Sequence, residues 1–411
     1  MIKYLGKYRI NCEWDRGSLE PIKEDLFISC YKDAQIYRAY KNKLAYYRPS
    51  RGNSEVLARE LIGLGGCKLA KEFHDNKYRS FFINTSYDDL SQLNVSDSLT
   101  YHVPSSKGCA KKREVALAYA RDYYGEMTGK LIDTHPTSKI FLVHYTLGGG
   151  TGGGLSNFFM ATLRNKLKEM GKKDATIIAV VAKPRKFESY QLQYNAKKSL
   201  EELYTLVGAN IVDQYYIINN DSRDDLDDIN MEHYMLFDRW IEGEGANNSS
   251  NADESERLDL FKSKGQSLMF TFDATDIDSF RENCKEAYDN SIYCHAVRKP
   301  KMVGYALYNG INQEEAIEVL EQTIGFFPND HSTPTKVSNI VMVSGVIDEK
   351  TNKAIENSIV ELANKKAGLI NGEVNDEIEE VKIETVNVDS NKKNEKKESM
   401  ASIDDILKFF S

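Results

Sequence analysis

Apolar runs and segments with helical spacing alternate along most of the chain. The apolar runs are nearly continuous, which is typical of strands whose two faces are both covered. In the segments between them, apolar residues recur every three or four positions, as on one face of a helix. Strands that alternate with helices predict a parallel, doubly wound α/β sheet of Rossmann-like type. The predicted strands are 79–86, 139–146, 175–184 and 212–220, and the predicted helices are 111–132, 155–171, 187–207 and 229–243.

A second, smaller α/β region follows the polar loop 244–256. After Gly368 the chain becomes poor in aromatic residues and rich in Glu, Lys and Asn, which predicts a disordered tail. The tail ends in a short amphipathic segment, 402–411, in which apolar residues stand at helical spacing. In the second region the predicted strands are 267–273, 303–310 and 339–347, and the predicted helices are 276–289, 313–324 and 350–366.

The composition adds limits to this picture. With 411 residues, of which 41% are hydrophobic, the chain can build two packed domains. The net charge of −8 argues against direct binding of nucleic acid through bulk charge. The six cysteines form no C-x-x-C pair and no zinc-binding spacing, so we expect a reduced, cytoplasmic protein without a structural metal site. No signal peptide or bilayer-spanning apolar run is recognisable, so we expect no direct membrane contact.

The stretch LGGGTGGGL at 147–155 is the sharpest motif. It follows the apolar residues 140–143 and precedes a predicted helix. A glycine-rich turn at this place exposes bare backbone N–H groups at the positive end of a helix dipole, which is well suited to binding phosphate. The motif therefore predicts a phosphate-containing ligand.

Three other interpretations of the glycines are weaker. A dinucleotide fold is suggested by Gly148-x-Gly150-x-x-Gly153, but the next strand ends in Lys183-Pro184 rather than in an acid that could hold a ribose. A P-loop would need Gly-Lys-Ser/Thr after the glycines, and none follows. A hinge without a ligand would carry a large entropic cost from six glycines for no gain.

The segment GGGTGGG resembles the glycine signature of the tubulin/FtsZ family of GTPases. Three further segments resemble that family in the same order: FINTSYDDL (82–90) its second nucleotide loop, SSKGCAKKRE (105–114) its third, and VVAKPRKFES (180–189) the stretch after the signature helix. The resemblance covers about residues 55–275 well and the second region by pattern only. Together with the acidic tail, it is greatest for the TubZ group of tubulin-like GTPases from plasmids and phages of low-GC bacteria.

The resemblance implies how the loops bind GTP or GDP. Backbone donors of the glycine loop would wrap the α- and β-phosphates, with a threonine hydroxyl added, and the third loop would approach the γ-phosphate. The second loop ends a strand at the edge of the sheet where ligands bind in such folds. The implied contacts are Gly148, Gly149, Gly150, Thr151, Gly152 and Gly153 in the glycine loop, Gly108, Cys109, Ala110 and Lys111 in the third loop, and Asn84 and Thr85 in the second.

The first nucleotide loop has two possible registers. LIGLGGCKLAKEF (61–73) offers a glycine-rich turn at a suitable distance before the second loop, although the strand before it contains Arg59-Glu60. The rival register takes 43–57 as strand, loop and helix. We favour the former register, which makes Gly63, Gly65, Gly66 and Cys67 the candidate contacts.

Guanine recognition needs an aromatic face and a group that accepts from the N1–H and 2-amino donors. Tyr234 and Asp238 stand at i and i+4 on one helix face, and the resemblance matches them to the aromatic and Asn of tubulins. By the same resemblance, Asn220 is a second base contact and Glu188 aligns with the acid at the ribose. Leu192 stands where FtsZ has an arginine.

The nucleotide loops contain no obvious general base to orient the attacking water. In the family, the catalytic acids come from the next subunit, and alignment assigns that role to Asp253 and Glu256; Glu254 lies between them. The resemblance therefore implies that the chain binds a second copy of itself head to tail and that stacking completes the site. A heterologous contact that does not close gives an open filament. Mg²⁺ would accompany the nucleotide.

The sequence thus predicts a tubulin-like GTPase that forms dynamic filaments for plasmid or phage DNA segregation, with a DNA-bound adaptor protein held by the tail. An FtsZ-like cell-division GTPase, a non-polymerising GTP-binding regulator and a dinucleotide-binding enzyme are the alternatives. The predicted organisation is an N-terminal extension (1–50), a GTP-binding domain (51–227), a central helix and catalytic loop (228–258), a C-terminal α/β domain (259–367) and a flexible tail (368–411).

Overall fold

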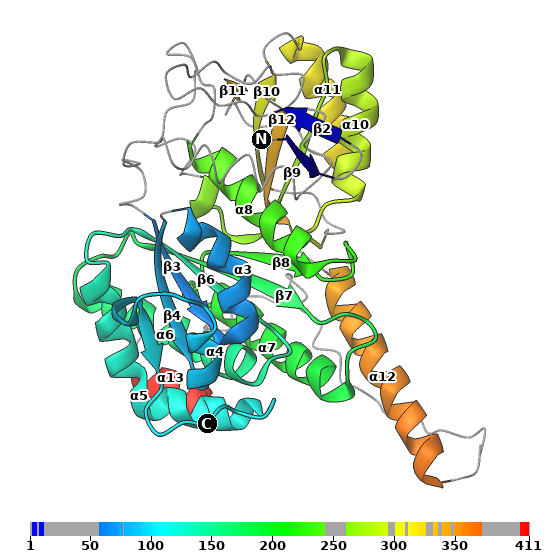
Figure 1. Cartoon of the computed structure of the whole chain (residues 1–411). Coiled ribbons are helices and arrows are strands. Elements are labelled where there is room, and N and C mark those ends of the chain that lie inside the picture. The colour runs from blue at the N-terminus through cyan, green and yellow to red at the C-terminus, as the bar shows by residue number, and fades with distance from the viewer. Residues whose placement is uncertain are drawn as a thin grey trace, which may run out of the picture.

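A ten-stranded sheet forms the centre of the protein, with strand order β11-β10-β12-β9-β8-β7-β6-β3-β4-β5 (Figure 1). The computed structural model describes residues 2–5, 8–11, 57–76, 78–242, 260–294, 301–308, 311–325, 332–335, 339–346, 349–371 and 403–410.

The six strands that follow the N-terminal region pair only in parallel. Each parallel strand needs a crossover connection, which explains the alternation of strands and helices in the sequence. The strands are β3 (Leu57–Ile62), β4 (Arg79–Asn84), β5 (Thr100–His102), β6 (Ile140–Thr146), β7 (Thr176–Lys183) and β8 (Gln214–Asn219). The helices are α3 (Gly63–Asp75), α4 (Tyr87–Ser91), η2 (Asp97–Leu99), α5 (Arg113–Thr134), α6 (Gly150–Glu169), α7 (Tyr190–Gly208) and α8 (Leu226–Glu242).

The second region continues the same sheet with mixed strand directions. The link is short: β8 and β9 pair through Gln214 with Gly265 and Tyr215 with Gln266. Beyond it, β9, β12 and β10 are antiparallel, and β10 and β11 are parallel. The elements are η3 (Leu260–Lys262), β9 (Gly265–Phe272), α10 (Ile277–Asp289), β10 (Met302–Tyr308), α11 (Gln313–Ile324), β11 (Ser332–Thr335), β12 (Asn339–Val346), α12 (Glu349–Asn371) and α13 (Ile403–Phe409); β1 (Ile2–Leu5) and β2 (Tyr8–Asn11) form a separate antiparallel pair.

The apolar strands supply two cores, one on each face of the sheet. In β7, Ile178 and Val180 join the core under α3 and α8, whereas Ile177, Ala179 and Val181 join the core under α5, α6 and α7. Successive side chains of a strand point to opposite faces, so a strand covered on both sides must be apolar throughout. The first core extends without a break into the strands of the second region.

The predicted α/β class is confirmed, with two shifts in its elements. The helix predicted at 155–171 begins at Gly150, because the glycines form its first turn rather than a loop before it. The helix predicted at 350–366 continues to Asn371, past the residue at which the tail was expected to begin. The domain boundaries stay a prediction, and most of 1–50 and of the tail lies outside the described residues. No helix in the described ranges has the length and apolarity needed to cross a membrane.

Candidate nucleotide site

Three loops from separate parts of the sequence meet at the carboxyl edge of the parallel strands. Thr85, directly after β4, shares a 2.7 Å hydrogen bond with the hydroxyl of Thr151 in the first turn of α6. The Thr85 hydroxyl also accepts from the Cys109 thiol at 3.2 Å, and the Thr85 carbonyl accepts from the Gly108 N–H at 2.6 Å. The second loop, the third loop and the glycine helix therefore lie together, as a phosphate site requires.

The first turn of α6 is suited to an anion. Its N-cap, Gly149, offers no side chain to cap the helix N–H groups, and no acidic residue lies in the first turn. Uncapped N–H groups and the helix dipole both attract negative charge. Gly149 and Thr151 are half-buried, so this end of the helix is accessible from solvent.

Most of the glycines also allow close packing of the protein itself. A Cβ on Gly153 would lie 2.3 Å from the carbonyl of Leu147, and one on Gly66 would lie 2.3 Å from that of His144. A Cβ on Gly63 would lie 3.0 Å from the N–H of Gly152, which places the start of α3 against the glycine helix. The glycines therefore bring three segments of backbone together, in addition to any contact with a ligand.

The third loop has an unusual backbone. Ser105, Ala110 and Lys111 are non-glycine residues with positive φ, at 60°, 46° and 62°, and Gly108 has φ of 83°. A non-glycine residue in this region costs about 1–3 kcal/mol, and such strain concentrates at functional sites. The loop is held in place by Asn195, whose side-chain N–H groups donate to the carbonyls of Lys111 at 2.8 Å and Gly148 at 3.0 Å.

Sequence analysis missed Asn195 because it stands in the middle of a helix. It is fully buried, and its partners lie on two loops that are distant in the chain. The only signal was an amide on the buried face of α7, where an apolar residue is usual. Asn84 was predicted to contact the ligand, but it is buried and binds the loop: its amide donates to Asp89 at 3.2 Å and its carbonyl accepts from the N–H of Ser86.

The first loop follows β3, between β4 and β6, which agrees with the favoured register of 61–73. Gly63 and Gly65 stand in the first turn of α3. Cys67 is fully buried in the core, and burial raises the pKa of its thiol well above the ordinary value. Its side chain packs into the core, so any contact of Cys67 with the nucleotide would be made by its backbone and stays a prediction. Most of the rival register, 43–57, lies outside the described residues.

Glu188 and Asn220 lie close together on neighbouring loops. The carboxylate of Glu188 accepts from the N–H of Arg185 at 2.7 Å, and the Arg185 side chain donates to the carbonyl of Asn220 at 2.9 Å. Lys183 joins the same loops by donating to Asp221 at 2.5 Å. Burial alone would raise the pKa of Asp221, but Lys183 holds it below its ordinary value, so the ion pair persists at neutral pH.

Tyr234 and Asp238 do not reach the site, which corrects the prediction for the base. Both are fully buried, and Asp238 accepts a 2.7 Å hydrogen bond from Tyr78. Tyr78 precedes β4, at the edge of the sheet opposite the nucleotide loops. The i, i+4 spacing places the two residues on one helix face, but both are buried in the core in the second half of α8.

The start of α8 offers another pair on the side of the nucleotide loops. Leu226 is 44% exposed and Asn230, four residues later, is partly exposed. The loop that leads into this helix is tied to the loop after β7 by Arg185, which donates to the carbonyl of Asp224 at 2.7 Å. Leu226 and Asn230 precede Asp238 by about 18 and 12 Å along the axis, at 1.5 Å per residue.

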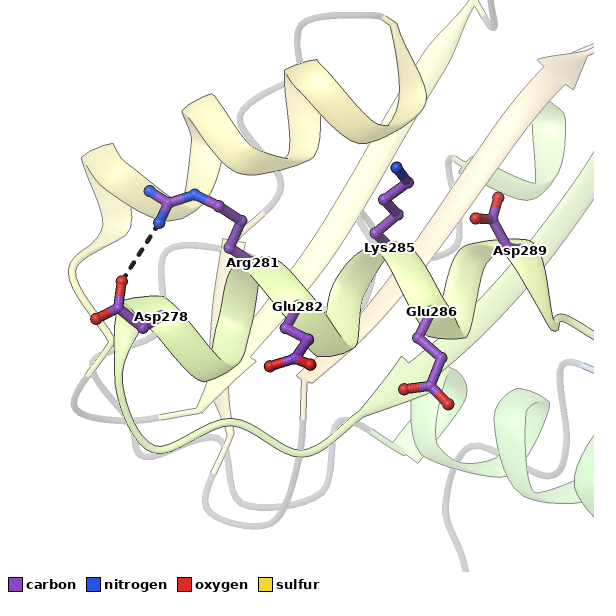
Figure 2. A pocket seen from close by; sticks show the side chains of 6 residues that line it. All are labelled: Asp278, Arg281, Glu282, Lys285, Glu286 and Asp289. Carbon is purple, nitrogen blue, oxygen red and sulfur yellow. Dashed lines mark hydrogen bonds and ion pairs between the residues drawn. The ribbon is translucent and has the colours of Figure 1, made fainter.

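Asp253 and Glu256, the predicted catalytic acids, lie outside the described residues. Among the residues that are described, no three His, Cys, Asp or Glu side chains gather to hold a metal ion. A hollow beside α10 is lined by six charged side chains of that one helix and lies in the second region, away from the nucleotide loops (Figure 2). Asp278 and Arg281 form an ion pair there at 3.3 Å. A solvated face of a single helix explains this hollow.

Comparison with known proteins agrees with the fold and with a GTPase domain. Residues 55–224 match the Tubulin/FtsZ family, GTPase domain. The tubulin-like protein TubZ of a Clostridium botulinum C phage is 24% identical over 381 residues, which is 90% of this chain and 99% of TubZ. The crystal structure of Clostridium botulinum phage c-st TubZ shares the fold with a TM-score of 0.65 and 20% identity, over 76% of this chain and 99% of that one.

A second solved structure, a GTPγS-form protofilament of Bacillus thuringiensis serovar israelensis TubZ, has a TM-score of 0.64 and 15% identity, over 77% of this chain and 94% of that one. The family match covers all the loops that meet at the carboxyl edge and removes the dinucleotide-enzyme interpretation. These matches identify residues 55–224 as a GTP-binding GTPase domain of the tubulin/FtsZ type.

Proposed function

We propose that the chain polymerises head to tail into dynamic filaments and hydrolyses GTP at the contact between subunits. The observation that carries this proposal is a group of exposed apolar side chains around the nucleotide edge. Phe187 is 77% exposed and Tyr87 64%, both just beyond parallel strands. The other members are Val115, Tyr190, Tyr194 and Leu226, each at or near the start of a helix at this edge.

Exposed aromatic side chains gathered at one place are typical of an interaction surface. Tyr190 and Tyr194 stack with ring centroids 6.1 Å apart, and the guanidinium of Arg185 lies 5.9 Å from the ring of Phe187. A second copy that covered this surface would also cover the nucleotide. Filament contact and nucleotide state would then be coupled through one interface.

The chemistry of the site supports a contribution from a second subunit. The carboxylates of Asp89, Glu188 and Asp221 at this edge each accept a hydrogen bond from the protein. These hydrogen bonds hold all three carboxylates within the loops, and we assign orientation of the attacking water to acids of the next copy. Asp253 and Glu256 of the next copy would supply that function, so an isolated subunit would bind GTP but hydrolyse it slowly.

For the nucleotide itself, we propose that the glycine helix and third loop hold the phosphates and that Asn230, with Leu226 beside it, reads the guanine. Glu188 and Asn220 remain the proposed ribose and second base contacts. Mg²⁺ usually binds to nucleotide phosphates with few protein ligands, which suits a site without a carboxylate cluster. The oxygens available to it are those of Thr85, Thr151 and Asp89; when bound, it would neutralise phosphate charge.

The biological role that we propose is segregation of plasmid or phage DNA in the cytoplasm, with the tail bound to a DNA-bound adaptor protein. Similarity to TubZ along 90% of the chain supports this role. Bacillus thuringiensis TubZ has been solved as a protofilament, and TubZ-Bt has a helical model of a two-stranded filament, which supports the filament.

Right-angle light scattering with GTP tests polymerisation. Scattering should rise above a threshold protein concentration with GTP but not with GDP, and GTPase activity per molecule should rise with it. Replacing Phe187 by Ser should raise the threshold about tenfold, since burial of one Phe contributes about 1.5–3 kcal/mol. Met170→Ser is the matched control, because Met170 is 45% exposed at the other end of α6. Activity per molecule that stays flat, without scattering, would contradict the proposal.

Substitution of the predicted acids tests the shared active site. Asp253→Ala and Glu256→Ala should each slow GTP turnover about 10²–10⁴-fold, the usual contribution of general acid–base catalysis. GTP binding and polymerisation should persist, so filaments should become long-lived. In mixtures of each variant with wild-type chain, GTP turnover of the filaments should fall in proportion to the fraction of variant. Unchanged turnover in both variants would place catalysis elsewhere.

A further inference from the structure

The last segment of the chain is docked on the GTPase domain. The helix α13 (403–409) lies against α5 and α6, at the end of the molecule away from the strands of the second region (Figure 1). Ile406 is 1% exposed and Phe410 5% exposed, and both belong to the core on that face of the sheet. Ile403 and Leu407 pack partly against the same core. Four apolar positions of the segment are therefore used within one subunit, whereas Phe409 is 39% exposed.

The contact is specific in its geometry. The ring of Phe410 meets the ring of Phe158 from α6 edge to face at 5.3 Å, and Phe158 in turn meets Tyr124 of α5 at 6.0 Å. Arg121 of α5 donates to the backbone carbonyl of Phe410. A cation that binds the last carbonyls of a helix complements both its free acceptors and its dipole. We call this surface of α5 and α6 the tail groove, defined by Arg121, Tyr124 and Phe158.

The opposite face of α13 is exposed and charged. Asp404, Asp405 and Lys408 point away from the core, and the two acids stand in the first turn, where they favour the helix dipole. A helix of seven residues is not stable in water on its own, because nucleation costs more than so few hydrogen bonds return. The helical form of this segment therefore depends on the groove that it occupies.

The chain between α12 and α13 is long enough for this contact. Asn371 and Ile403 are separated by 31 residues, and a fully extended chain of that number reaches at most about 100 Å. A tether of this length gives an effective concentration on the order of 1 mM. Even if its intrinsic affinity is weak, the terminal helix is thus mostly bound to the tail groove of its own subunit, and a competitor can still displace it.

We propose that the tail groove is a docking site for the chain's own terminal helix, and that this helix must leave the groove before its apolar face can bind another protein. We call this arrangement a latch, because Ile406 and Phe410, which a partner protein would contact, are buried in the free subunit. The docking does not depend on GTP, filaments or an adaptor; only its use in cargo binding rests on the proposed function.

A labelled peptide tests the groove. Fluorescein-labelled peptide 400–411 is titrated with GDP-bound full-length chain, either wild type or carrying Ile406→Asp and Phe410→Asp to disable its own tail. The peptide should bind the double variant at least about tenfold more tightly, because the wild-type groove is already occupied. Adding Arg121→Glu to the double variant should weaken binding again. Equal affinity for both proteins, or no binding to the double variant at millimolar concentration, would overturn the proposal.

Hydrogen exchange of the full-length chain gives an independent readout. Amides of 403–410 should be protected in the wild type and exchange freely in Ile406→Asp, whereas Asp404→Ala, on the exposed face, should keep the protection. Protection should not change with protein concentration, since the contact is within one subunit. A wild-type tail that exchanges freely, or protection that appears only at high concentration, would contradict docking in cis. Neither assay needs polymerisation. A negative result in these two assays would therefore not contradict the filament proposal, and a negative light-scattering result would not contradict docking of the tail.

Discussion

The nucleotide edge and the core beside α8 both contain polar side chains, but in different roles. At the edge, Thr85, Thr151 and Asn195 hold three loops together while the first turn of α6 stays open to solvent. Beside α8, buried polar groups bind one another. Tyr78 donates to Asp238 at 2.7 Å, and Arg239 donates to the hydroxyl of Thr271 at 3.2 Å.

The buried histidines show this best. His144 lies with Nδ1 3.2 Å from the carbonyl of Leu142, so Nδ1–H donates and Nε2 accepts. His233 then donates through Nε2 at 3.1 Å, and its Nδ1 accepts from Tyr293 at 2.7 Å. Burial raises the pKa of Tyr293 well above its ordinary value, so it stays a donor. Both ring nitrogens of His144 and of His233 are used in these hydrogen bonds. These polar residues therefore have a structural role, unlike those at the nucleotide edge.

The largest expected effect concerns the glycines. In Gly153→Ala the new methyl meets the carbonyl of Leu147, so we expect a loss of about 1–3 kcal/mol in unfolding free energy and a severe loss of GTP binding. Gly125→Ala is the matched control, because a Cβ there has no neighbour within 4 Å and helix propensity should add about 0.5–1 kcal/mol. Urea unfolding and nucleotide titration measure both. A stable Gly153→Ala that binds GTP normally would remove the packing role.

The second prediction separates the two parts of α8. Asp238→Asn should cost about 1–3 kcal/mol of stability by weakening a buried hydrogen bond, and leave the preference for GTP over ATP unchanged. Asn230→Ala should leave stability nearly unchanged and lower GTP affinity about tenfold or more, the usual effect of one lost base contact. Competition binding with GTP and ATP checks both variants. A changed base preference in Asp238→Asn would reverse the assignment.

The smallest effect is on pH dependence. His135 is buried at the end of α5, with Nε2 3.3 Å from the carbonyl of Ser80, and burial lowers its pKa below the ordinary value near 6.5. Because the folded state holds this proton less well than the unfolded state, protonation favours unfolding, and stability should fall as the pH drops from 7.5 to 5.5. In His135→Gln the slope of unfolding free energy against pH should be smaller; an unchanged slope would exclude His135 as its source.

Much of the fold was predictable from local patterns. A strand such as β7 must be apolar throughout when both faces are covered, and a glycine run after a buried strand has few other uses than close backbone approach and phosphate binding. Placement of the second loop beside α6 followed from the parallel sheet, because all the carboxyl ends of its strands lie at one edge, whereas the third loop was expected there only from the family resemblance.

What the sequence determined by itself was therefore the order of strands and helices and the position of the glycine run between β6 and α6, since both depend on short-range periodicity and backbone freedom. Only the tertiary structure decided which turn of α8 lies at the nucleotide edge, that Cys67 and Asp238 belong to the core, that Asn195 ties two loops together, and that the terminal helix folds back onto α5 and α6. These outcomes depend on contacts between residues far apart in the chain, and periodicity says which side chains share a face but not what that face meets.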